Sequence, residues 1–418
     1  MKKRFSLTVL AAAALSSFLL LSACSGSDSN KDSSSSKNEL VFWAMGDEAS
    51  TTKELVKGFT KETGIKVKVQ AIPWSNAHDK MLTAIASKSG PDVVQVGTTN
   101  MAEFVEAGAL ADITNKIDST DNLDPSKFYP ASVETTQFHD KTYGIPWYVE
   151  TRVLFYRTDI LEAAGYSEPP KTWDELHDVA VTLSKRGDDL YGFNIDPNEG
   201  TFGFMFGRQN GSELINEKGE PVLDEKEFVD AINYLDSFIK DGATPKQDLG
   251  MDITQSFGGD KPILPMFVSG PWMVNTLETT APELDGKWAI ATLPKKENNL
   301  SALGGSDLAV FEYSNQKENA LKLIDYLSRS DVQMDYLKST KNLPSNVEAW
   351  EDPSIKNDGN YQIFKEQLEA SKAMPLVPQY EEMAESYKKY WEQIAVNGAD
   401  VDQSMKDFNA EVAQMLKK

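Results

Sequence analysis

The sequence predicts an α/β fold with mixed, mainly parallel sheets, and two observations support this prediction. From residue 40 to residue 96, segments with the pattern of strands alternate with segments that have the period of amphipathic helices. An alternating order of strands and helices places successive strands in parallel, joined by right-handed crossovers. The chain has 418 residues, of which 40% are hydrophobic, so it can form about two to four domains with separate cores.

The strands and helices can be assigned in order from the start of the globular part. Leu40–Met45 is an apolar run typical of a buried strand, and the helical pattern after it ends at Gly64. Residues 65–72 alternate between apolar and polar side chains, which predicts a half-buried strand. A second helical pattern precedes a strand at residues 92–96, and a long helical stretch from Tyr361 onward closes the chain.

Residues 1–23 have the three regions of a bacterial secretory signal peptide. Basic residues at positions 2–4 precede an apolar run at 5–21, and small residues come just before Cys24, the only cysteine of the chain. The run is marginal as a transmembrane span, which needs about 20 apolar residues. Its end resembles the lipobox of bacterial lipoproteins, which implies that Cys24 is lipidated and anchors the protein on the extracellular face of the cytoplasmic membrane. Residues 24–38, rich in serine and charged residues, are predicted to be a flexible tether.

The composition argues against several classes of function. Acidic residues outnumber basic residues 64 to 42, for a net charge of −22, so the chain lacks the basic surplus of a nucleic-acid-binding protein. One cysteine and three scattered histidines argue against a disulfide and a metal site, and no cofactor is expected. The P-loop, the dinucleotide-binding glycine motif, H-E-x-x-H and G-x-S-x-G are all absent from the sequence. The turn at 304–307 (GGSD) comes nearest to a nucleophile motif, but it lacks the trailing glycine.

Three tryptophans stand beside proline residues that stiffen the backbone, namely Trp74, Trp147 and Trp272. A sugar ring presents an apolar face that suits an aromatic side chain and a hydroxyl rim that suits carboxylates, amides and guanidinium groups. These three residues are therefore candidate stacking platforms, with burial in a core as the competing interpretation. The tryptophans inside predicted strands or at a helix start are expected in the core: Trp43, Trp173 and Trp288.

An ordered set of segments resembles the extracellular solute-binding proteins of bacterial ABC sugar importers, of the maltose- and maltodextrin-binding kind. The set covers nearly all of the chain after the tether: 41–46, 59–69 (FTKETGIKVKV), 90–94, 149–161 (VETRVLFYRTDIL), 169–176, 269–272, 293–294, 304–310 and 374–379. The resemblance implies a periplasmic-binding-protein-like fold with two α/β lobes and a cleft between them. It places lobe 1 at 39–148 and 308–342, lobe 2 at 153–303 and 347–418, and hinge segments near 149–152, 304–307 and 343–346.

The resemblance also implies a set of sugar contacts in the cleft. By position, Asp47, Glu150 and Trp272 match two carboxylates and one stacking platform of the family, and residues 194–204 match a loop that carries a carboxylate and aromatic side chains. The family's maltose site has other residues near the ends of the first and third strands, where Glu48, Thr99 and Asn100 stand here, so the ligand is expected to differ from maltose. A late stacking tryptophan of the family is replaced by Ala384, with Tyr380 close by. The predicted ligand contacts are Asp47, Glu48, Trp74, Asn76, Thr99, Asn100, Trp147, Glu150, Arg152, Phe202, Trp272, Ser306 and Asp307.

Two classes of function remain open from the sequence. The first is a lipid-anchored, monomeric receptor without enzyme activity, which captures an oligosaccharide and delivers it to the transmembrane subunits of an ABC permease. The second is a secreted carbohydrate-active enzyme that uses Asp47 and Glu150 as a carboxylate pair. A receptor for a polyamine or a peptide is a weaker alternative, because so many of the candidate residues are aromatic. Arg152 could bind the carboxylate of a uronate, although an ion pair within the protein is the expected role.

Overall fold

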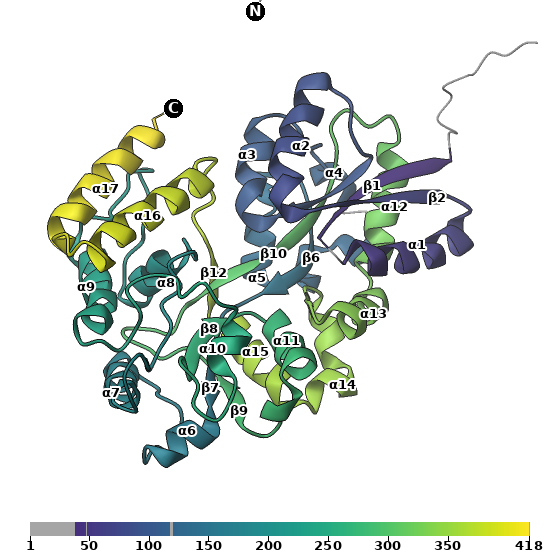
Figure 1. Ribbon diagram of the computed structural model, residues 1–418. Helices are drawn as coiled ribbons and strands as arrows, with labels where there is room; N and C mark the ends of the chain where they lie inside the picture. Colours follow the sequence, from purple (N-terminus) through teal and green to yellow (C-terminus); the bar gives the residue numbers. More distant parts are fainter. Residues whose placement is uncertain (1–37, 47, 118–119, 418) are drawn as a thin grey trace, which may run out of the picture. The chain divides into compact units, whose positions relative to one another are not determined.

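A mixed seven-stranded sheet contains the N-terminal strands of the computed structural model, which describes residues 38–46, 48–117 and 120–417 (Figure 1). The strand order is β11-β6-β10-β3-β1-β2, and β12 pairs with the first part of β10. Strand β1 is parallel to β2 and to β3, whereas β10 runs antiparallel to both β3 and β6. The strands are β1 (Glu39–Met45), β2 (Lys66–Ile72), β3 (Val93–Gly97), β6 (Ile145–Glu150), β10 (Ser301–Val310), β11 (Leu343–Pro344) and β12 (Ser371–Ala373).

A second sheet has three strands in the order β8-β7-β9, and both of its pairings are antiparallel. Its strands and those of a small separate hairpin are β7 (Val153–Arg157), β8 (Met266–Ser269), β9 (Trp288–Ala291), β4 (Gln137–Phe138) and β5 (Lys141–Thr142). The expected parallel pairing therefore holds for β2-β1-β3 and for β10-β12, and the remaining pairs are antiparallel. The pairs of β10 with β3 and β6 are antiparallel because β10 returns to the first sheet from the opposite direction, which no local pattern in the sequence specifies.

Helices cover both faces of the seven-stranded sheet. Side chains of α1, α12 and α13 pack on one face with Leu40 and Phe42 of β1. Side chains of α2 and α3 pack on the other face with Trp43 and Met45 of the same strand, so the core assignment of Trp43 is confirmed. These helices are α1 (Ala49–Thr63), α2 (Trp74–Ser87), α3 (Met101–Glu106), α12 (Lys317–Leu327) and α13 (Ser330–Thr340), with the short α4 (Thr114–Ile117) and α5 (Pro130–Glu134) nearby in sequence.

The three-stranded sheet also has a core on each face. Leu154 of β7 lies in a large apolar cluster with α7, α8, α9, α16 and α17, and this cluster contains Trp173. Phe155, the next residue, lies in another cluster with α10, α11 and α15, and its ring stacks on Trp288 at 5.9 Å. The helices are α6 (Thr158–Ala163), α7 (Trp173–Ser184), α8 (Phe202–Gln209), α9 (Lys226–Lys240), α10 (Ile253–Phe257), α11 (Trp272–Thr280), α14 (Pro353–Lys356), α15 (Gly359–Glu369), α16 (Tyr380–Ala395) and α17 (Val401–Met415). In the part of the chain that the structure describes, none of the helices has both the length and the apolar character of a membrane span.

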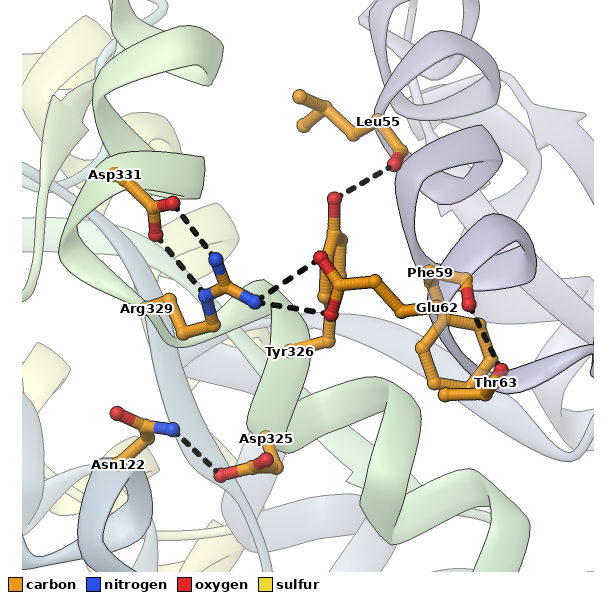
Figure 2. A network of polar contacts seen from close by, with 9 residues as sticks. All are labelled: Leu55, Phe59, Glu62, Thr63, Asn122, Asp325, Tyr326, Arg329 and Asp331. Carbon is orange, nitrogen blue, oxygen red and sulfur yellow. Dashed lines mark hydrogen bonds and ion pairs between the residues drawn. The ribbon is translucent and has the colours of Figure 1, made fainter.

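A polar network centred on Arg329 ties α1 to the junction between α12 and α13 (Figure 2). The guanidinium group donates to both carboxylate oxygens of Asp331, at 3.1 and 2.8 Å, and its Nη1 lies 3.1 Å from Oε2 of Glu62 on α1. The same group lies 5.1 Å from the ring centre of Tyr326, whose hydroxyl donates to the carbonyl oxygen of Leu55 at 3.4 Å. The network therefore fixes α1 against the two later helices, on the face of the sheet opposite to α2 and α3.

Strand β10 pairs with different strands along its length. Its residues 301–303 pair with β12, and its residues 304–310 pair with β6 and β3. Gly305 has a φ of 116°, and a Cβ atom at this position would lie 2.2 Å from the carbonyl oxygen of Tyr148. Any side chain at residue 305 would therefore force β10 away from β6, which explains the requirement for glycine at this crossing.

Candidate functional site

A cavity of about 570 Å³, called here the cleft cavity, lies between the seven-stranded sheet and the helices α11 and α16, which pack with the three-stranded sheet. Its walls come from the turns after β1 and β3, the end of β6, the first part of β10 and the start of α16. In open α/β sheets, ligands bind beyond the carboxyl ends of the strands, and β1, β3 and β6 all end at this cavity. Its size is that of a site for a small molecule or a short oligomer.

Glu150 and Arg152 both line the cleft cavity and lie close to each other. Nη1 of Arg152 is 3.8 Å from Oε2 of Glu150, and Nη2 is 3.5 Å from Oε2 of Glu199. Burial raises the pKa of Glu150, the Arg152 charge lowers it, and the nearby carboxylates Glu48 and Glu199 raise it further. The ion-pair role expected for Arg152 is therefore present, but both distances are longer than normal hydrogen bonds.

Two tryptophan rings border the cleft cavity, one on a helix that packs with the seven-stranded sheet and one on a helix that packs with the three-stranded sheet. Trp74 is the first residue of α2 and is 42% exposed, whereas Trp272 is the first residue of α11 and is partly buried. A Cβ atom at residue 270 would lie 2.0 Å from the Trp272 ring, so Gly270 is required for the ring to fold back over the chain. The guanidinium carbon of Arg152 is 4.7 Å from the centre of the Trp272 ring, which joins this platform to the charged group.

The first turns of α16 form a wall that sequence reasoning missed in part. Glu381, Glu385 and Lys388 line the cleft cavity together with Tyr380 and Ala384, the two positions that the resemblance had indicated. Across the cavity, the hydroxyl of Thr99 donates to Oε1 of Glu381. The sequence offered no signal for the three charged residues, because their spacing on a helix is that of an ordinary solvated face.

A second cavity, called here the inner chamber, has a volume of about 230 Å³ and adjoins the cleft cavity. The two cavities share four wall residues: Arg152, Glu199, Thr201 and Trp272. The rest of the chamber is lined mainly by apolar side chains, which include Phe202, Met205, Ile253, Phe267 and Met273. Asn194, Asp196 and Ser269 add polar groups to its wall.

The structure brings seven of the predicted contacts to the cleft cavity and places five others elsewhere. Those that line the cleft cavity are Glu48, Trp74, Thr99, Asn100, Glu150, Arg152 and Trp272. Phe202 lines the inner chamber, Asn76 is exposed on α2 outside both cavities, and Trp147, Ser306 and Asp307 are buried. Asp47 and the lipidation candidate Cys24 lie outside the described residues.

Trp147 does not line the cleft cavity because it is packed in the core. The pairing of β6 with β10 is irregular at this residue, since Tyr148 pairs with Ser306 and Pro146 with Asp307. Trp147 is 1% exposed, lies in the same apolar cluster as Tyr148, and its ring centre is 4.6 Å from that of Tyr336. Ser306 and Asp307 are both fully buried within β10, beyond the two glycines at 304 and 305 that line the cavity.

The chemistry of the site is that of binding polar ligands with apolar faces. Carboxylates accept hydrogen bonds from hydroxyl groups, a guanidinium donates to ligand oxygens, and the tryptophan rings offer apolar surfaces. No group of three or more histidine, cysteine, aspartate or glutamate side chains placed to hold a metal ion occurs in the described part of the chain.

Comparisons with known proteins agree with this geometry. Residues 44–334 match the model of a family described as bacterial extracellular solute-binding protein. The chain is 28% identical to the galactooligosaccharide-binding protein of Bacillus subtilis (strain 168) over 430 residues, covering 99% of this chain and 97% of that protein. The sugar-binding protein MalE from the phytopathogen Xanthomonas citri superposes with a TM-score of 0.85 at 32% identity, covering 91% of this chain and 97% of that chain. A solute-binding protein of an ABC transporter from Thermotoga lettingae, bound with α-D-tagatose, superposes with a TM-score of 0.79 at 26% identity, covering 91% of this chain and 100% of that chain. These likenesses confirm the predicted two-lobe α/β fold.

Proposed function

Because the chain belongs to the family of bacterial extracellular solute-binding proteins, we propose that it is the oligosaccharide receptor of an ABC importer. The receptor captures the sugar in the cleft cavity and delivers it to the transmembrane subunits of the permease. The observation that carries the proposal is the composition of the cavity wall. Two tryptophan rings, Trp74 and Trp272, border the same cavity as the carboxylates of Glu48, Glu150 and Glu199.

Each kind of wall residue suits one feature of a sugar. The C–H faces of a pyranose stack on aromatic rings, and its hydroxyl groups donate to carboxylates in charge-assisted hydrogen bonds. Five acidic residues and two basic residues line the cleft cavity, so its charge favours a neutral sugar over a uronate. The relative from Bacillus subtilis, by its name, binds galactooligosaccharides, which makes this class the first to test.

The proposed mechanism is closure of two lobes around the bound sugar. The lobes are those that the resemblance implies, with the crossings near 149–152, 304–307 and 343–346 as hinges. Residues 301–303 and 304–310 of β10 pair with different partner strands, which supports a change of lobe within this strand. A ligand drives closure only if it binds the closed state more tightly than the open state. Simultaneous contact of the sugar with Trp74 and Trp272 provides that difference in affinity.

A ligand panel tests the proposed function directly. Galactooligosaccharides, maltodextrins, oligogalacturonates, a polyamine and a short peptide are each added to the purified protein, and the unfolding temperature is measured. We expect a rise with a neutral oligosaccharide, because binding to the native state alone raises apparent stability. The same mixtures are then analysed for products. Intact sugar supports a receptor, whereas cleavage would identify the chain as a carbohydrate-active enzyme.

The proposed lipid anchor leads to a separate prediction for the variant Cys24→Ala. Without the thiol that receives the diacylglyceryl group, the protein is expected to leave the membrane fraction or to stay unprocessed. Metabolic labelling with a palmitate analogue and detergent phase partitioning measure the change. As a control, Ser25→Ala changes the neighbouring residue and is expected to keep the label. Equal labelling of Cys24→Ala and the native protein would contradict the anchor.

A further inference from the structure

The inner chamber is connected to the proposed binding site through a shared wall. Arg152, Glu199, Thr201 and Trp272 line both cavities, so a molecule in the cleft cavity that passes these side chains enters the chamber. Val268 and Ser269, at the carboxyl end of β8, also line it. The chamber thus lies at the carboxyl end of β8.

Arg152 at this shared wall has hydrogen-bond donors that the protein does not use. Nη1 of Arg152 is buried and has no hydrogen-bond partner among the described residues. Its nearest carboxylate oxygens are 3.8 Å away on Glu150 and, from Nη2, 3.5 Å away on Glu199. A buried, unpaired donor is unfavourable unless a ligand or water supplies the acceptor, so this guanidinium is placed for an oxygen-rich ligand.

The wall of the chamber suits a single sugar unit. Phe202, Met205 and Ile253 provide apolar surface, and Asn194 and Asp196 provide polar groups on the same wall. Its volume of about 230 Å³ is less than half that of the cleft cavity, at about 570 Å³. It is therefore too small for a second oligosaccharide and fits one end of a ligand that lies mainly in the cleft cavity.

We infer that the inner chamber receives the terminal monosaccharide unit of the oligosaccharide, with Arg152 at its entrance donating hydrogen bonds to ligand oxygens. This inference rests on the proposed function and extends it, because the protein then recognises the end of a sugar chain rather than an internal stretch. The affinity rises with each added sugar unit until both the chamber and the cleft cavity are full, and then reaches a plateau.

The variant Ile253→Trp tests the inference by filling the chamber. Ile253 is a partly buried residue of α10 that lines the chamber and not the cleft cavity. Galactooligosaccharides and maltodextrins of one to six units are titrated calorimetrically into the native protein and the variant. We expect the affinity of Ile253→Trp to reach its plateau one unit earlier and to fall at least tenfold for the best native ligand. The matched control is Gln255→Trp, which adds the same ring at an exposed position of the same helix and should keep the native profile.

The outcomes separate this inference from the proposed function. If the native protein binds sugars and Ile253→Trp has the same plateau and affinity, the chamber is not a subsite and the receptor function stands. If the native protein binds none of the sugars, both the function and the inference are contradicted. Should Ile253→Trp fail to fold, as judged by its unfolding temperature beside that of Gln255→Trp, Ile253→Phe fills less of the chamber and is expected to shift the plateau in the same direction.

Discussion

Replacing Trp147 by alanine is expected to destabilise the protein by about 3–5 kcal/mol. The side chain is 1% exposed, packs against the Tyr336 ring at 4.6 Å and belongs to the core beneath the seven-stranded sheet. Its removal leaves a cavity that the surrounding side chains cannot fill. Urea unfolding measures the loss, and Trp147→Phe, which keeps one ring, is expected to lose less.

The matched control for this prediction is Trp74→Ala. Trp74 is also preceded by proline, but it is 42% exposed, so its removal is expected to change the free energy of unfolding by less than about 1 kcal/mol. Native-like stability of Trp147→Ala together with a loss of sugar binding would show that Trp147 acts in the cleft and that its core assignment is wrong.

Asp307→Asn is expected to make the protein more stable, and increasingly so as the pH rises. Asp307 is fully buried in β10, accepts a hydrogen bond from the Thr135 hydroxyl at 3.0 Å, and has no partner at its other oxygen among the described residues. Burial raises its pKa to about 8, whereas an aspartate in an unfolded chain has a pKa of about 3.9.

The direction in which stability changes with pH follows from proton binding. Between pH 4 and pH 8 the folded protein holds a proton on Asp307 that the unfolded chain has lost, so stability falls by about 1.4 kcal/mol per pH unit in this range. The loss stops above pH 8, where both states are ionised. Asparagine does not titrate, and the advantage of Asp307→Asn should therefore grow by about 4 kcal/mol from pH 5 to pH 8.

Urea unfolding at pH 5, 6, 7 and 8 measures this growth. At pH 7 the net gain is expected to be about 1–3 kcal/mol, because the buried amide of asparagine offsets part of the benefit. Asp188→Asn, at an exposed loop position, controls for the removal of one negative charge and should not show the trend. A constant difference between Asp307→Asn and the native protein across this pH range would contradict a buried, protonated Asp307.

Local patterns were sufficient to predict the N-terminal part of the fold. The apolar run at 40–45, the alternation at 65–72 and the run at 92–96 become β1, β2 and β3, in parallel as expected. The antiparallel course of β10 could not be predicted, because its partners β3 and β6 are distant in sequence and tertiary packing sets the pairing.

Site residues that follow the end of a strand could be predicted from the sequence, whereas those in other elements could not. Trp147 and Trp272 both follow a proline, but only the packing of the distant Tyr336 ring against Trp147 shows that Trp147 is a core residue. Lys388 on α16 reaches the cleft cavity through the docking of a helix that begins 230 residues after Glu150, at Tyr380. No spacing within one element reveals such a contact.

The central claim is that a sugar binds in the cleft cavity between Trp74 and Trp272, and calorimetric titration of single variants tests it most directly. The best ligand of the panel is titrated into the native protein, Trp74→Ala, Trp272→Ala and Leu82→Ala, the last being an exposed apolar residue of α2 outside the cavity. Stacking of a nucleic-acid base on an aromatic ring is worth about 1–3 kcal/mol, and by analogy we expect a similar contribution from a sugar face. Both tryptophan variants should therefore bind about tenfold more weakly or worse, and Leu82→Ala should bind normally. Full affinity in both Trp74→Ala and Trp272→Ala would place the sugar elsewhere and contradict the account.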